Sequence, residues 1–125
     1  AETLFRTFSG TVSRYPAGYT FFLSALHLSL AAPREVVIAA EQGGEKLRQE
    51  LAPITRPFAP TTTFLYRLEG KDAEELKALA PFTAEMRPLQ GKTTYYLCEN
   101  FACRQPTTNR QELIRVLAEN QVCCE

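Results

Sequence analysis

The chain has 125 residues, of which 45% are hydrophobic and 22% are charged. This is the size and composition of an ordinary globular domain rather than of a disordered chain. Fourteen basic residues balance fourteen acidic ones, so the composition favours neither a nucleic acid nor an anionic membrane as a partner, since both attract a cationic surface.

The first part of the chain predicts two helices. Apolar residues at positions 4, 5, 8 and 12 recur at helical spacing within residues 2–13. Pro16 marks a break, and residues 17–31 predict a second helix that is apolar over most of its circumference. Such a helix needs covering on more than one side. We therefore expect an apolar patch around Phe21, Phe22 and Leu26, through which the chain self-associates. The same stretch is too short to span a membrane.

The rest of the chain alternates predicted strands and helices. In chain order these are a strand at 35–40, a helix at 45–51, a strand at 61–68, a helix at 72–80, a strand at 93–98, a short return arm at 103–105 and a last helix with its apolar face at 113–117. Two capping boxes are expected, Asp72 with Glu75 and Thr108 with Gln111.

The predicted fold class is therefore α/β, with two leading helices followed by β-α-β-α-β-β-α. A strand, a helix and a strand in sequence predict a right-handed parallel crossover. We expect a small mixed sheet with its first two strands parallel, an antiparallel cysteine hairpin at one edge, and helices on its faces.

Two cysteines, Cys98 and Cys103, flank a turn expected at residues 99–102. If that loop is a four-residue hairpin, their side chains face each other near the separation that a disulfide needs. Two interpretations stay open: a reversible redox pair, or a reduced and buried pair that packs as small hydrophobes. A zinc site that adds Cys123 and Cys124 is disfavoured, because adjacent cysteines chelate one ion poorly. No metal or other cofactor is expected, and the core looks large enough without disulfides, which favours a cytoplasmic location.

Other candidate sites are weaker. Gly43 and Gly44 follow a predicted strand and precede a helix, where phosphates bind in doubly wound folds. Glu41 and Glu45 flank them and would repel an anion, so a simple turn is the better interpretation. His27 is the single histidine and has no predictable partner, which favours a structural role. No catalytic residue is predicted.

The segment 95–108 carries the pattern Cys-Glu-Asn-Phe-x-Cys-x-x-Pro, and residues 33–38 read Pro-Arg-Glu-Val-Val-Ile. Both resemble the C-terminal end of the YyaL-like proteins, also called the spermatogenesis-associated, thioredoxin-domain-containing family. The resemblance covers the whole chain. Glu99, Asn100 and Phe101 match the motif together with the two cysteines, although the resemblance assigns them no role.

The resemblance implies a larger protein with a thioredoxin-like domain, then an (α/α) toroid like that of N-acylglucosamine 2-epimerases, then this α/β tail. Residues 1–125 would form a single α/β domain whose helical segment 1–32 continues the toroid. The leading hypothesis is a non-catalytic accessory or interaction domain whose partners are the upstream domains of the same protein. One alternative is a thiol–disulfide redox module that uses Cys98 and Cys103. A second is one wall of a sugar-processing, epimerase-like active site.

Overall fold

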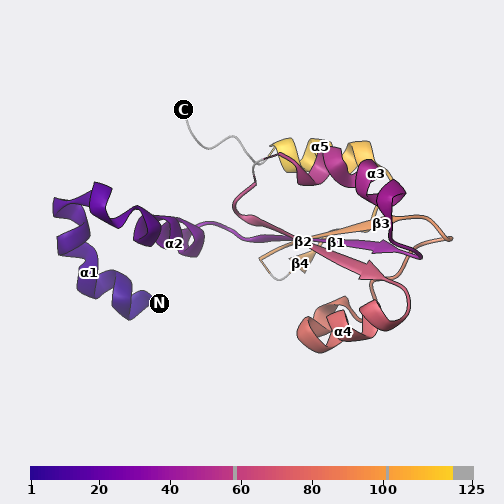
Figure 1. Cartoon of the computed structure of the whole chain (residues 1–125), viewed down its shortest axis with the longest axis horizontal. Coiled ribbons are helices and arrows are strands. Elements are labelled where there is room, and N and C mark those ends of the chain that lie inside the picture. The colour runs from indigo at the N-terminus through magenta and orange to yellow at the C-terminus, as the bar shows by residue number, and fades with distance from the viewer. Residues whose placement is uncertain (58, 101, 120–125) are drawn as a thin grey trace. The chain divides into compact units, whose positions relative to one another are not determined.

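A computed structural model describes residues 1–57, 59–100 and 102–119. The chain divides into two compact units, Ala1–Pro33 and Arg34–Glu125, which we call the leading unit and the sheet unit (Figure 1). Within the described residues, no helix has both the length and the apolar character needed to cross a membrane.

The leading unit contains two helices joined by a 3₁₀ turn. Helix α1 covers Glu2–Arg14, the turn η1 covers Pro16–Tyr19, and helix α2 covers Thr20–Leu30. Pro16 occupies the first position of the 3₁₀ turn, where its missing N–H costs nothing. The second helix was expected from residue 17, and its first residues form this tighter turn instead. The two helices are otherwise as predicted.

The sheet unit alternates strands and helices in the predicted order. Its elements are β1 (Arg34–Ala40), α3 (Glu45–Thr55), β2 (Thr62–Leu68), α4 (Lys71–Leu79), the 3₁₀ turn η2 (Pro81–Thr83), β3 (Thr94–Glu99), β4 (Ala102–Cys103) and α5 (Arg110–Glu119).

The four strands form one mixed sheet in the order β2-β1-β3-β4. Strands β1 and β2 are parallel, whereas β3 pairs antiparallel with both β1 and β4. The predicted parallel first pair and the predicted cysteine hairpin at one edge are therefore confirmed. Strand β1 is the centre of the sheet and is almost entirely buried, as its β-branched run indicates.

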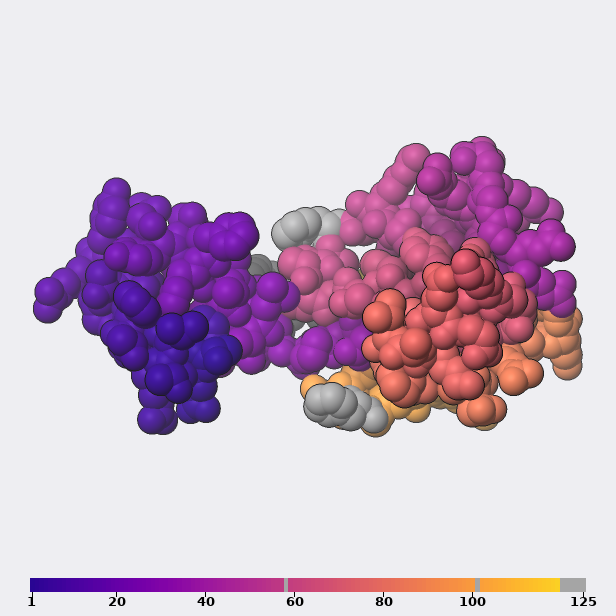
Figure 2. All heavy atoms as spheres, turned by 60° about the horizontal axis from the view of Figure 1, so that its bottom comes forward, coloured from indigo at the N-terminus to yellow at the C-terminus, as the bar shows by residue number. Residues whose placement is uncertain are grey.

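Helices cover both faces of the sheet. Helices α3 and α5 lie on one face, and α4 lies on the other side (Figure 1). In Figure 2, α4 and the residues that follow it cover the side of the sheet unit that is turned to the viewer. The main core lies under α3 and α5 and consists of Val36, Ile38, Leu51, Ile54, Tyr95, Leu97, Leu113 and Leu117. A smaller cluster on the opposite face contains Val37, Met86 and Cys98.

Helix α3 is longer than predicted, because it continues through Pro53 to Thr55. A proline inside a helix removes a backbone hydrogen bond and usually ends the helix. Here Ile54 is buried in the main core one turn after Leu51, and the Thr55 hydroxyl donates to the Leu51 carbonyl at 3.2 Å. The tertiary burial of this last turn outweighs the local cost of the proline.

Both predicted capping boxes are wrong. Gly70 precedes the first residue of α4 with a φ of 102°, so Asp72 lies inside the first turn and makes no capping bond. At α5, the Asn109 side-chain oxygen accepts hydrogen bonds from the amides of Gln111 at 3.0 Å and Glu112 at 3.4 Å. The cap of α5 is therefore Asn109 rather than Thr108.

Candidate functional site

The β3–β4 hairpin places Cys98 directly opposite Cys103, and the two form a disulfide. The Arg104 amide donates to the Leu97 carbonyl at 2.8 Å, so the neighbouring cysteine pair is of the type that exchanges no backbone hydrogen bonds. Side chains approach most closely in pairs of this type. The structure therefore shows this pair oxidised.

The turn of this hairpin is tighter than expected. Glu99 pairs with Ala102, so these two residues belong to the paired strands rather than to the turn expected at residues 99–102. Asn100 has a φ of 50°, in the left-handed region that asparagine tolerates better than most residues because its side chain can bond to nearby backbone. Asn100 is therefore a turn residue, while Phe101 lies outside the described residues.

Glu99 connects the hairpin to the centre of the sheet. Its Oε2 accepts from the Arg104 guanidinium at 2.8 Å, and its Oε1 lies 4.0 Å from Nε of Arg34. The buried Arg34 also donates from Nη1 to the Leu117 carbonyl at 3.4 Å. A charge that is buried needs a partner, so we assign Glu99 of the motif a structural role: it pairs with Arg34 and holds the return arm through Arg104.

The two cysteines differ in their exposure to solvent. Cys98 is 3% exposed and belongs to the smaller core cluster, whereas Cys103 is exposed at the sheet edge. Cys103 is therefore the more accessible residue of the pair for an external thiolate. Glu35 is the cross-strand partner of Cys98.

The structure does not bring together a metal site from the cysteines. Cys123 and Cys124 lie outside the described residues, and Cys98 and Cys103 are bonded to each other. Among the residues that the structure describes, no group of three or more histidine, cysteine, aspartate or glutamate side chains could hold a metal ion.

The remaining candidates of the sequence occupy ordinary positions. Gly43 and Gly44 connect β1 to α3, and Gly44 has a φ of 122°, which favours glycine. A Cβ at position 43 would lie 2.8 Å from Leu68 Cδ1, so Gly43 permits close packing. His27 is exposed on α2 and accepts a backbone bond from Ala31 in the last turn.

The apolar patch expected on α2 is divided between two environments. Phe21 is 92% exposed. Phe22 and Leu26 are half-buried, and the Phe22 ring meets those of Phe5 and Phe8 edge-on at centroid distances of 5.2 and 6.1 Å. Phe22 and Leu26 also line a groove of about 730 Å³ within the leading unit.

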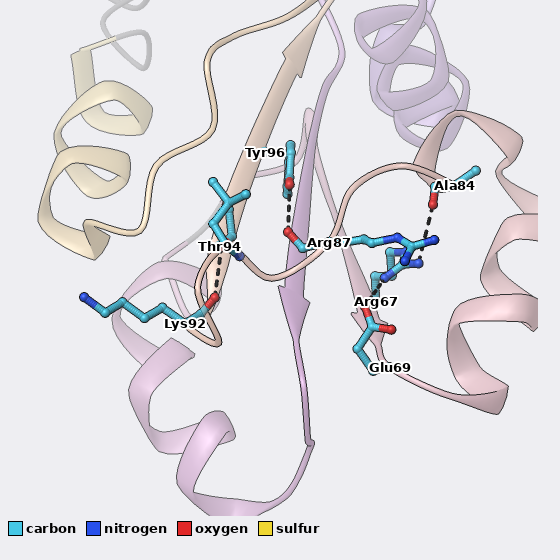
Figure 3. Close-up of polar contacts among 8 residues, drawn as sticks. Arg67, Glu69, Ala84, Arg87, Lys92, Thr94 and Tyr96 are labelled. Carbon is cyan, nitrogen blue, oxygen red and sulfur yellow. Dashed lines mark hydrogen bonds and ion pairs between the residues drawn. The ribbon is translucent and has the colours of Figure 1, made fainter.

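A buried arginine escaped the sequence reasoning. The Arg67 side chain is buried in the sheet unit and donates to Glu69 at 2.6 Å and to the Ala84 carbonyl at 3.4 Å (Figure 3). Tyr96 donates from its hydroxyl to the Arg87 carbonyl at 2.7 Å. These bonds tether the segment after η2 to the sheet. A charged residue within the β-forming run 61–68 was the signal that could have indicated such a contact.

A second missed position is Tyr95, whose ring belongs to the main core. Burial raises the pKa of Tyr95 above its usual value of 10.0; the nearby Arg110 charge lowers it and the Glu50 charge raises it. Sequence reasoning treated Tyr95 as part of a strand and of a motif. Only the packing of α3 and α5 beside that strand brings the two opposite charges near its hydroxyl group.

Comparison with known proteins finds a distant similarity to spermatogenesis-associated protein 20. The human protein is 25% identical to this chain over 114 residues, and the rat protein is 24% identical over the same length. The aligned region is 91% of this chain but only 14% of either relative, so the chain spans about a seventh of their length. No protein-family model matches the chain, and no solved structure matches it.

Proposed function

We propose that this chain is a non-catalytic accessory domain of a longer protein and that its leading unit docks against helices upstream in that protein. The observation that carries the proposal is the lack of a core in the leading unit. Among residues 1–33, all of which the structure describes, Val12 alone is buried. The similarity to a small part of a much longer protein supports the same conclusion.

The exposed apolar surface of the leading unit is large for its size. Phe21 is 92% exposed and Leu30 is 78% exposed, and four more large apolar side chains of the unit are also exposed. These four are Leu4, Phe8, Tyr15 and Leu28. Burial of a large apolar side chain contributes about 1.5–3 kcal/mol, and units this small seldom fold without further support. A helical partner that covers α2 would supply that support.

The test compares hydrogen exchange at the α2 amides in this chain and in the full-length protein. We expect exchange at residues 20–30 to be slower in the full-length protein, because docking would protect the helix. Phe21→Gln in the full-length protein should remove much of that protection. The control Phe82→Gln alters an exposed aromatic residue of the sheet unit and should leave α2 unchanged. Equal exchange of α2 in both contexts would refute the proposal.

The isolated chain offers a second test. If the apolar face of α2 is left uncovered, it should bind a second copy, and light scattering should show a mass that rises with concentration. Phe21→Gln should reduce this self-association. A concentration-independent monomer would contradict an exposed docking face, whatever the full-length protein shows.

A second candidate function is thiol–disulfide exchange, and the observation that favours it is the exposed Cys103 beside the buried Cys98. The co-reactant would be a protein dithiol, such as the thioredoxin-like domain that the resemblance implies upstream. Its thiolate would attack the Cys103 sulfur, and Cys98 would leave as a thiolate and take up a proton. The second thiol of the donor would then release Cys103, so the donor becomes a disulfide and this pair gains two electrons.

Redox titration in glutathione buffers, with mass spectrometry of each cysteine, tests this second function. A redox function requires the pair to open and close reversibly at potentials of the cellular thiol couples. A pair that stays oxidised in buffers with a reduction potential below about −300 mV behaves as a structural disulfide. That result would exclude the exchange function. That outcome would leave the docking proposal untouched.

A further inference from the structure

A polar pocket of about 580 Å³ lies in the sheet unit beside the start of α5. It is open to solvent and is lined by the loop before β3, one residue of β3, residues 108–111 at the start of α5, and one residue of α3. The residues that matter for its chemistry are Glu50, Lys92, Thr93, Tyr95, Thr108 and Arg110. We call it the phenol pocket.

Tyr95 forms the floor of the phenol pocket. It is 5% exposed, whereas the other residues that line the pocket are exposed or half-buried. Its ring packs in the main core. The charges of Arg110 and Glu50 both act on the pKa of its hydroxyl. These two residues also line the pocket, so the hydroxyl end of the side chain faces the pocket.

The Tyr95 hydroxyl has no hydrogen-bond partner among the described residues, although the backbone N–H and C=O of Tyr95 both bond to Thr107. Solvent reaches this hydroxyl, since it is not one of the buried side-chain atoms that lack a partner. Burial raises the pKa of this phenol, so it remains protonated at neutral pH and is available as a donor. A ligand oxygen that enters the pocket can replace the water that this donor would otherwise bond.

Two cationic side chains, Lys92 and Arg110, also line the phenol pocket. Arg110 is fixed in place because its Nη1 donates to the Glu50 carbonyl at 2.9 Å. Lys92 belongs to the loop that the Thr94 hydroxyl fastens: this hydroxyl accepts from the Leu89 amide at 2.8 Å and donates to the Lys92 carbonyl at 2.9 Å. Figure 3 shows the Lys92 side chain extending away from this loop.

The charges that line the phenol pocket sum to a cationic site, since Lys92 and Arg110 oppose the one carboxylate of Glu50. The start of α5 adds the positive end of a helix dipole. Two of its amides are already capped by the Asn109 side chain. A ligand would therefore be held by the phenol and the two cations, and not by a row of free amides as in a phosphate-binding loop.

We propose that the phenol pocket binds the phosphate group of a small molecule, with the Tyr95 hydroxyl donating to one oxygen and Lys92 and Arg110 on either side. Thr93 and Thr108 supply further hydroxyl donors at the rim. The Glu50 carboxylate weakens the attraction and restricts the site to one anionic group. The site is independent of the docking face proposed above, which lies in the leading unit.

The probe for the test is inorganic phosphate, added to the ¹⁵N-labelled chain at constant ionic strength with chloride as the balancing anion. We expect saturable shifts of the amide signals at residues 92–95 and 108–111. Tyr95→Phe keeps the ring in the core and removes the hydroxyl, and it should weaken binding about tenfold, as loss of a hydrogen bond to a charged group does. Lys92→Gln should also weaken binding.

Matched controls separate binding from general effects of charge or hydroxyl content. Tyr66→Phe removes the hydroxyl of an exposed tyrosine on β2, and Lys77→Gln removes a cation of α4, which lies on the other side of the sheet from α5 (Figure 1). Both should bind phosphate as the parent does. The proposal is overturned if phosphate causes no more change than chloride, or if Tyr95→Phe binds equally well. If Tyr95→Phe fails to fold, Lys92→Gln decides, because Lys92 is exposed.

Discussion

Reduction of the Cys98–Cys103 disulfide should lower the stability of the sheet unit only modestly. The bond closes a short loop with a sequence separation of 5. The chain-entropy relation gives about 2 kcal/mol for a loop of this length. The relation assumes that the folded hairpin keeps its geometry without the bond, and the turn at Asn100 and the Glu99–Arg104 ion pair hold the hairpin together in the reduced chain. We therefore expect the free energy of unfolding to fall by about 2 kcal/mol.

Urea denaturation followed by circular dichroism, with and without a phosphine reductant, measures this difference. The matched variant is Cys103→Ser, which removes the bond at an exposed position and leaves no core cavity. Its stability should match that of the reduced parent to within about 0.5 kcal/mol and should not respond to reductant. A response of the variant would indicate a contribution from Cys123 or Cys124.

Two results would refute this reasoning. A loss above about 4 kcal/mol on reduction exceeds what closure of so short a loop supplies and would mean that the bond maintains packing elsewhere in the sheet unit. Free Cys98 and Cys103 thiols in protein prepared without reductant would mean that the bond does not form in solution.

Three further predictions concern the core, a cap and a titration. Leu51→Ala should cost about 2–5 kcal/mol in denaturant unfolding because Leu51 is fully buried, whereas Leu79→Ala, at an exposed position, should change stability by less than about 0.5 kcal/mol. Asn109→Ala should lower the free energy of unfolding by about 1 kcal/mol, because it removes the cap of α5. Thr108→Ala should lower it much less in the same denaturant assay. Equal effects of the two substitutions would contradict the capping assignment. The pKa of Tyr95 is raised in the folded protein, so above pH 10.0 the unfolded chain releases this proton first and stability falls as the pH rises. Tyr95→Phe should lose less stability than the parent over that pH range. Identical pH profiles of the two proteins would argue against a raised pKa.

Periodicity and turn residues were sufficient to predict the elements of the sheet unit and their order. The β-branched run in residues 35–40 predicted a buried strand, and that strand is β1 at the centre of the sheet. The strand, helix and strand order predicted the parallel pair β1–β2. The short spacing between Cys98 and Cys103 predicted that they face each other, because pairing across a tight turn is a local property of the chain.

Local signals failed where a distant contact competed with them. The sequence predicted a helix that ends at residue 51, but burial of Ile54 against the main core extends α3 to Thr55. Capping patterns pointed to Asp72 and Thr108, yet the helix starts are set by Gly70 and Asn109. Similar capping patterns can match at neighbouring positions, and only the path of the chain into each helix selects the residue that caps it.

The sequence by itself determined the α/β class, the two leading helices, the cysteine hairpin and the apolar character of α2. Only the tertiary structure decided that Cys98 is buried while Cys103 is exposed, and that Tyr95 faces a cationic pocket. Both results depend on contacts between residues far apart in the chain, such as the packing of Cys98 in one cluster with Val37 and the bond of Arg110 to Glu50. Hydrophobic patterns specify which residues are buried together, but they do not specify which polar groups the packing of strands and helices brings within reach of one another.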